Sequence, residues 1–257
     1  GLDNLLKIYN QLQEEHAGIF YLIHNNKLDV TNFKKLIHKI SLKENIFLEK
    51  ILLIRNKQHN KFKNQFHDIY NAYINNECLD KYNSYDKEYE RDFMNHIPII
   101  DNKDESKIFK DIDTWHRRYY MFQIYHHHNY NPSYADILEI QINDICKNYL
   151  ESFVWTSNYY FDDCISWKWY YKYHFAPTMK DFNNYLNNIN DLNIIKIDKI
   201  PLKSSEQLRL ILPEKSFYLL PKNVKKFPDY YYPKSFKTNY IMKRYNWEGH
   251  PILPEII

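Results

Sequence analysis

Glycine is nearly missing from this chain, and its scarcity constrains the fold more than any other feature of the sequence. Only three glycines, Gly1, Gly18 and Gly249, occur in 257 residues. Glycine is the usual residue where the backbone needs a positive φ angle, so such loops must be few and a helical architecture is favoured. The same scarcity excludes enzymes that hold phosphate or a dinucleotide in a glycine-rich loop.

Net charge, cysteine spacing and hydropathy further limit the class of protein that this chain can be. The formal net charge is only +3, so a nucleic-acid-binding surface would require local clustering of basic residues. The cysteines, Cys78, Cys146 and Cys164, fit neither a disulfide framework nor a zinc-ligand pair, which favours a reducing, intracellular compartment. No apolar run approaches the length of a membrane span, and no membrane partner is expected.

Apolar residues recur every third or fourth place over most of the chain, which predicts a mainly α, irregular multi-helix domain with long helices. The predicted helices cover residues 2–13, 31–40, 41–75, 105–125, 133–160, 178–186 and 204–211, with caps at Thr31 and Thr178 and a capping box from Ser41 to Glu44. Asn25-Asn26 is a turn signal.

Two stretches lack this helical pattern. Residues 77–104 are rich in Asp, Asn, Lys and Tyr without a clear period, and we expect a loop or mobile connection there. Prolines recur from Pro213 onward, which predicts an extended, proline-rich segment over residues 213–257, packed on the helices. A chain of this length is expected to form a single domain over residues 1–257.

The run SWKWYYKYHFAP, from Ser166 to Pro177, contains two tryptophans, three tyrosines, a phenylalanine and a histidine. Rings at consecutive positions point all around a helix or to both faces of a strand, so some must meet solvent or a ligand. One interpretation, favoured by spacing alone, is an aromatic mini-core that holds a loop. The other is a platform on which bases of single-stranded nucleic acid stack, with Lys168 and Lys172 placed to meet phosphate.

Other polar clusters have simpler interpretations. The adjacent His126, His127 and His128 cannot converge on one metal from a helix, so a solvated or interface tract is expected. Two carboxylate pairs, Asp111 with Asp113 and Asp162 with Asp163, are candidate ligands of a divalent cation. No further acidic residues accompany them at a recognisable spacing, and we expect helix capping and solvation instead.

Arg117 and Arg118 lie between Trp115 and the pair Tyr119-Tyr120. Cationic and aromatic side chains in this order suit contacts to phosphate, and equally an arginine stacked on tyrosine at a helix surface. No nucleophile and base can be paired from the sequence.

Several stretches together resemble one family, the XRN 5′→3′ exoribonucleases, in the helical second conserved region that follows their nuclease region. The residues that match around the aromatic run are Tyr149, Glu151, Trp155, Tyr159-Tyr160, Ser166, Trp167, Trp169, Tyr170-Tyr171, Tyr173-His174 and Ala176-Pro177. Further matches are Gly1–Asp3, Asn25–Leu28, Trp115 with Tyr119-Tyr120, Glu206–Leu208, Leu212-Pro213, Trp247, Gly249, Leu253-Pro254 and Ile256.

The chain also departs from the family pattern. The differing residues are Ser152, Val154 and Asp162 in place of glycine, glutamine and glycine, Lys172 in place of proline, Ser204-Ser205 in place of Pro-Phe, and Glu255 in place of phenylalanine. These departures are also consistent with a divergent or non-catalytic member of the family.

In the resembled family, the magnesium-binding carboxylates and the pocket for the 5′-monophosphate belong to the first conserved region. The resemblance therefore implies no catalytic residue and no bound cofactor or metal in this chain, with Mg²⁺ held by a nuclease region in the same polypeptide or a separate chain. The chain would form the RNA-channel portion of an enzyme that degrades 5′-monophosphorylated RNA in the cytoplasm or nucleus. The alternative is a catalytically inactive RNA-binding or structural scaffold, for example in a viral particle.

The resemblance also assigns site residues. A tryptophan of the second region stacks on an RNA base near the active site, and by position it is Trp167 or Trp169. The residues expected beside it in a single-strand RNA channel are Lys168, Tyr170, Tyr171, Lys172, Tyr173 and His174. Arg117 and Arg118 are possible phosphate contacts.

Overall fold

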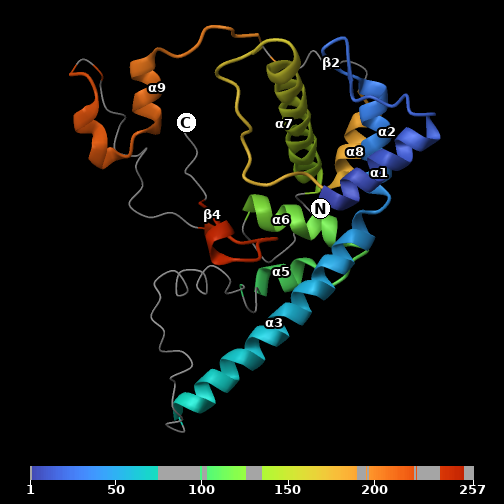
Figure 1. Cartoon of the computed structure of the whole chain (residues 1–257), viewed down its shortest axis with the longest axis vertical. Coiled ribbons are helices and arrows are strands. Elements are labelled where there is room, and N and C mark those ends of the chain that lie inside the picture. The colour runs from blue at the N-terminus through green and yellow to red at the C-terminus, as the bar shows by residue number, and fades with distance from the viewer. Residues whose placement is uncertain are drawn as a thin grey trace. The chain divides into compact units, whose positions relative to one another are not determined.

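The computed structural model describes residues 2–74, 99, 103–125, 135–189, 195, 197–222, 224 and 238–251. These residues are mainly helical (Figure 1), which confirms the predicted class. The chain divides into two compact units, described separately here: the first contains Gly1–Leu42, Ser133–Phe236 and Leu253–Ile257, and the second contains Lys43–Pro132 and Lys237–Ile252. The single domain over residues 1–257 stays a prediction, and the expected loop at 77–104 and the histidine tract at 126–128 lie outside the described residues, apart from residues 99, 103 and 104.

The first unit begins with α1 (Leu2–Glu15) and a small hairpin, β1 (Ile23–His24) and β2 (Lys27–Leu28). The strands pair antiparallel, with Ile23 opposite Leu28. Asn25 and Asn26 form the turn with φ angles of 49° and 63°, a left-handed conformation that asparagine tolerates better than most residues. The turn predicted from Asn25-Asn26 is confirmed.

The next helix, α2 (Val30–Ser41), is capped differently from the prediction. The Asp29 side chain accepts the backbone N–H of Asn32 at 2.8 Å, so Asp29 and not Thr31 is the N-cap. The expected capping box is also wrong, because Ser41 ends α2 and donates its hydroxyl to the carbonyl of His38 at 2.8 Å. Aspartate and threonine are both favoured N-caps, and the choice depends on which side chain faces the free N–H.

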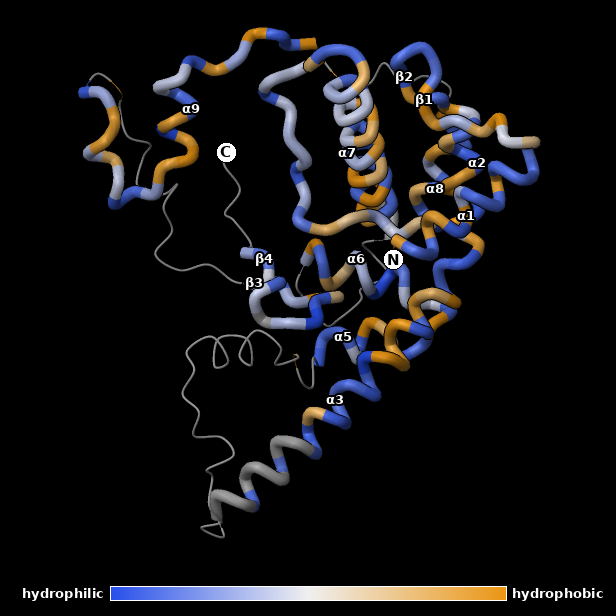
Figure 2. Tube along the Cα trace, viewed as in Figure 1, coloured by the Kyte–Doolittle hydropathy of each residue, from blue (hydrophilic) through white to orange (hydrophobic). Residues whose placement is uncertain are grey.

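The core of the first unit forms where α7 (Ala135–Phe161) and α8 (Met179–Asn187) pack together and α8 packs on α2. Figure 2 shows apolar residues recurring along α7. Leu138, Ile145 and Leu150 of this helix are fully buried, as is Phe182 of α8. Thr178 caps α8 as predicted, accepting the N–H of Asp181 at 3.2 Å.

Two further elements of the first unit lie within residues 200–220. The helix α9 (Ser204–Ile211) has the predicted bounds. It is followed by the 3₁₀ helix η3 (Glu214–Leu219), which begins directly after Pro213. Proline fixes φ near the value that opens such a turn. The packing of residues 213–257 on the helices stays a prediction.

The second unit contains α3 (Glu44–Ile74), α5 (Lys103–Ile108) and α6 (Trp115–Tyr125), of which α5 and α6 pack together. The continuous helical pattern predicted over 105–125 is divided, because Asp111 accepts the N–H of Asp113 at 3.0 Å and forms a turn. Tyr120 is fully buried in this unit.

A hairpin completes the second unit. Its strands β3 (Thr238–Asn239) and β4 (His250–Pro251) pair antiparallel, and the short 3₁₀ helix η5 (Asn246–Glu248) lies between them. Gly249 is required here by space, since a Cβ atom at this position would come within 2.5 Å of a Tyr240 ring carbon. Among the helices in the described part of the chain, none is long and apolar enough to cross a membrane.

Candidate functional site

The aromatic run is fixed to one face of α7. Asn148, Glu151 and Trp155 lie at i, i+3 and i+7 and therefore share a helix face. The Trp155 indole Nε1 donates to the carbonyl of Ser166 at 2.7 Å. In the other direction, the Trp169 indole donates to Glu151 at 3.0 Å. These contacts hold a segment without regular secondary structure against a rigid helix.

A third contact extends this attachment. The side-chain carbonyl of Asn148 accepts the backbone N–H of Lys172 at 2.8 Å, while its amide donates to Glu151 Oε2 at 2.7 Å. That oxygen is the one that accepts the Trp169 indole. Asn148 and Glu151 thus form one polar network that fixes both the side chain of Trp169 and the backbone of Lys172.

Exposure alternates along the run from Lys168 to Tyr173, as expected of an extended segment. The side chains of Lys168, Tyr170 and Lys172 are exposed, whereas those of Trp169, Tyr171 and Tyr173 are half-buried. Tyr170 is 66% exposed. The inner rings therefore form a small core, as the first interpretation expects, and the outer ones face solvent. The stacking of bases on the outer rings stays a prediction.

The inner rings pack in two groups. Trp155 stacks on Tyr159, with ring centroids 5.1 Å apart, and on Trp169 at 5.8 Å. The second group contains Tyr149 and Tyr171, whose rings meet edge to face. The Tyr171 hydroxyl also donates to the carbonyl of Phe175 at 2.7 Å, which joins this group to the buried core. His174 is half-buried and its ring contacts Phe175.

Trp167 differs from Trp169. Its backbone N–H donates to the carbonyl of Asp198 at 3.0 Å, within a bridge between Ser166 and Asp198. Its side chain is 49% exposed and makes no ring contact with any residue in the described part of the chain. The backbone of Trp167 is thus held in place while its indole faces solvent.

The lysines around the run are not equivalent. Lys168 Nζ lies 2.9 Å from Asp198, and Lys199 Nζ lies 2.8 Å from Asp163. The hydrogen bond from Lys199 lowers the pKa of the Asp163 carboxyl. Lys172 is exposed and forms no ion pair within the described residues. Of the two lysines inside the run, Lys172 is thus the one without an ion pair in the part of the chain that the structure describes.

The sequence that forms this site matches a known protein family over nearly its whole length. The family model described as the Xrn1 helical domain matches residues 1–256. The chain belongs to this family. The resemblance inferred from the sequence motifs is confirmed.

Curated relatives of this Xrn1-type helical domain carry the name 5'-3' exoribonuclease 2. The protein of Candida albicans is 30% identical over 153 residues, 57% of this chain and 16% of the relative. That of Saccharomyces cerevisiae is 30% identical over 165 residues, 62% of this chain and 15% of the relative. That of Aspergillus fumigatus is 35% identical over 119 residues, 44% of this chain and 11% of the relative. The matched part therefore spans a small fraction of each relative.

In the second unit of this helical domain, the Arg118 side chain forms hydrogen bonds with the segment that connects α5 to α6. Its guanidinium donates to the carbonyl of Ile108 at 2.8 Å, to the Thr114 hydroxyl at 2.9 Å and to the carbonyl of Asp111. These bonds hold the connection between α5 and α6. The phosphate contacts predicted for Arg117 and Arg118 stay predictions.

Two of the candidate carboxylates of this helical domain have partners within the chain. Asp163 is paired with Lys199, and Asp111 accepts hydrogen bonds from Asp113 and Thr114. Within the ranges that the structure describes, no three His, Cys, Asp or Glu side chains gather to hold an ion. The Asp111 carboxylate thus shapes a turn, and that of Asp163 forms a surface ion pair.

One feature of the second unit was missed from the sequence. Arg55 of α3 and Glu105 of α5 form a nearly buried ion pair, and Arg55 also donates to the carbonyl of Met242 at 2.7 Å. Met242 has a φ of 63°, so two helices hold a hairpin residue in a left-handed conformation. Burial raises the pKa of Glu105, although Arg55 and the backbone N–H of Met242 oppose the rise.

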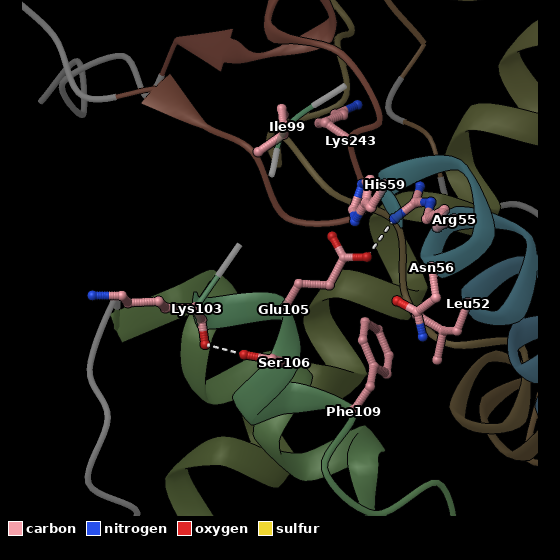
Figure 3. A pocket seen from close by; sticks show the side chains of 10 residues that line it. All are labelled: Leu52, Arg55, Asn56, His59, Ile99, Lys103, Glu105, Ser106, Phe109 and Lys243. Atoms are coloured by element: carbon pink, nitrogen blue, oxygen red, sulfur yellow. Dashed lines mark hydrogen bonds and ion pairs between the residues drawn. The ribbon is translucent and has the colours of Figure 1, made fainter. Parts of the chain in front are cut away.

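This ion pair borders a pocket of about 400 Å³ (Figure 3). The pocket is lined by Leu52, Arg55, Asn56, His59, Ile99, Lys103, Glu105, Ser106, Phe109 and Lys243. Figure 3 shows Lys103 pointing away from the Glu105 carboxylate. The pocket of this Xrn1-type domain thus lies where α3 and α5 meet the segments that contain Ile99 and Lys243.

Proposed function

We propose that this chain forms part of the RNA path of a 5′→3′ exoribonuclease that acts on 5′-monophosphorylated RNA. The hydrolytic Mg²⁺ would be held by a nuclease region in the same polypeptide or in a separate chain. Membership of the Xrn1 helical-domain family and the exoribonuclease names of its relatives support this function. The observation that carries it is the exposed indole of Trp167 on a backbone fixed by hydrogen bonds.

Within this proposal, Trp167 is the base-stacking residue and Trp169 positions the run. Stacking requires an accessible flat face, and each stacked base contributes about 1 to 3 kcal/mol. The Trp167 ring is accessible, whereas Trp169 packs on Trp155 and uses its indole N–H to bond Glu151. The exposed Tyr170 offers a second ring.

The chain's own residues would align the strand and would not cleave it. Trp167 would hold a base, and the Lys172 ammonium would attract a phosphate beside it. Holding the strand in one register lowers the entropic cost of bringing the scissile phosphate to the reacting groups. Mg²⁺, when bound by the nuclease region, would activate water and stabilise the leaving oxygen.

The test combines binding and cleavage. The purified 257-residue chain is incubated with 5′-monophosphorylated single-stranded RNA, or with a duplex of the same sequence, in the presence of Mg²⁺. We expect tighter binding of the single strand and no degradation. Robust degradation by this chain alone would contradict the assignment of the metal site to another region.

A second arm separates the enzyme part from a scaffold. Adding a nuclease region of an XRN protein is expected to produce degradation that depends on this chain. Unchanged RNA binding without any gain in degradation would instead support the inactive scaffold. Equal affinity for single strand and duplex would argue against a single-strand path.

A further inference from the structure

Basic residues cluster on α3, in the second unit. Residues 44–64 contain five lysines and arginines and only two glutamates. Asp68 is the one further charged residue of α3, so the whole helix has an excess of two positive charges. The local clustering that a nucleic-acid surface requires is therefore present on one helix.

Three of these lysines share one face of α3. Lys50, Lys57 and Lys61 are separated by seven and four residues, which places them within about 40° of one another around the helix axis and along about 16 Å of its length. All three are exposed. We call these three residues the lysine face of α3. Figure 2 shows hydrophilic residues recurring along this helix.

The lysine face is turned away from the packed side of the helix. Leu48 is buried and Arg55 bonds to Glu105, and both residues lie on the opposite side of α3 by helical periodicity. The lysine face is thus not occupied by the contacts that hold α3 in its own unit.

The lysine face also lacks the acidic partners of an ordinary solvated helix. Such helices commonly pair Glu with Lys at i and i+4, yet the nearest acidic residue in sequence, Glu49, lies about 100° around the axis from Lys50. Lys50, Lys57 and Lys61 make no ion pair with any residue that the structure describes. Within the described part of the chain, no acidic side chain balances these three exposed charges.

We propose that the lysine face of α3 binds the phosphate backbone of single-stranded RNA. This inference rests on the proposed function and adds a contact that is independent of the bases, separate from stacking on Trp167. The lysine ammonium is a strongly hydrated point charge that binds phosphate without demanding a fixed geometry. Exposed aliphatic neighbours such as Leu53 and Ile54 flank the lysines and leave the charges accessible.

The probe is an abasic single-stranded oligonucleotide, which carries phosphates but no rings to stack. Binding to the full chain is measured as a function of salt for the wild type and for a Lys50→Gln, Lys57→Gln, Lys61→Gln variant. Each lysine-phosphate contact contributes roughly 0.7 to the slope of log K against log salt. We expect the triple variant to lose about 2 from the slope, with an unchanged circular dichroism spectrum.

A matched control replaces three exposed lysines of the first unit, Lys7, Lys27 and Lys147, with glutamine. This variant has the same net charge and is expected to keep the wild-type slope. Equal losses in both triple variants, or no loss in the α3 variant, would overturn the proposal.

The Trp167→Ala variant separates this inference from the proposed function. On the abasic probe its affinity is expected to equal that of the wild type, whereas on RNA it is expected to fall. The Trp167→Ala variant could bind RNA as tightly as the wild type while the triple lysine variant still shows a smaller slope of log K against log salt on the abasic probe. In that case the proposed function is wrong and the phosphate-binding surface on α3 is supported.

Discussion

Glu151 Oε2 accepts the indole N–H of Trp169 at 3.0 Å, and the same oxygen accepts the Asn148 amide at 2.7 Å. One carboxylate of α7 therefore fixes the inner ring of the aromatic run. Together with the bond from Asn148 to the backbone of Lys172, it sets which side chains of the run face the core and which face solvent.

Replacing Glu151 with alanine should loosen the run. The change leaves the half-buried indole N–H of Trp169 and the Asn148 amide without an acceptor, which costs about 1 to 3 kcal/mol of unfolding free energy. Glu151→Gln keeps an acceptor and should lose less. Chemical denaturation measures both, and Glu139→Ala, an exposed change on the same helix, should stay within about 0.5 kcal/mol of wild type.

The two tryptophans should differ in their effect on stability. Trp169→Ala removes a stacked, hydrogen-bonded ring and should cost about 2 kcal/mol or more. Trp167→Ala removes an exposed ring and should change the unfolding free energy by less than about 0.5 kcal/mol. Thermal unfolding followed by circular dichroism compares them. Equal losses at both positions would mean that Trp167 is part of the packed core.

Gly249→Ala should destabilise the hairpin of the second unit. The new Cβ atom would lie 2.5 Å from a ring carbon of Tyr240 and 2.6 Å from Cγ2 of Thr238. Relieving such overlap costs about 1 to 3 kcal/mol. In a Tyr240→Ala background the loss should be smaller, because one of the two clashes is gone, and a double-mutant cycle measures the difference.

The stability of the second unit should depend on pH through Glu105. Its pKa is raised above 4.5 by burial, so the folded state holds the proton more tightly than the unfolded chain. The contribution of Glu105 to stability is then fully present below its ordinary pKa and lost as the pH rises through its folded pKa. The unfolding free energy of wild type minus that of Glu105→Gln should therefore fall as the pH rises above the ordinary pKa of glutamate, about 4.3. A rising difference would mean that the ion pair with Arg55 outweighs the cost of burial.

Most helices could be predicted because their core residues repeat along one face. Leu138, Ile145 and Leu150 of α7 are examples, each fully buried and each on the predicted apolar stripe. Helix starts were less predictable, since Asp29 and Thr31 are both favoured N-cap residues two positions apart and the folded backbone selects Asp29.

The exposure of rings in the aromatic run could be predicted from the sequence in outline and not in detail. The crowded rings of Ser166 to Pro177 showed that some must be exposed, but the choice between Trp167 and Trp169 depends on contacts from α7. Nothing local to the run signals that Glu151 lies beneath Trp169. The pair Arg55 and Glu105 is likewise separated by 50 residues, beyond any local pattern.

The most direct test of the central claim is the affinity of the Trp167→Ala variant for single-stranded RNA, measured at fixed salt beside the wild type. An exposed ring that receives a base predicts a loss of about 1 to 3 kcal/mol in binding free energy with no change in the unfolding free energy. Wild-type affinity in a normally folded Trp167→Ala chain would contradict the account.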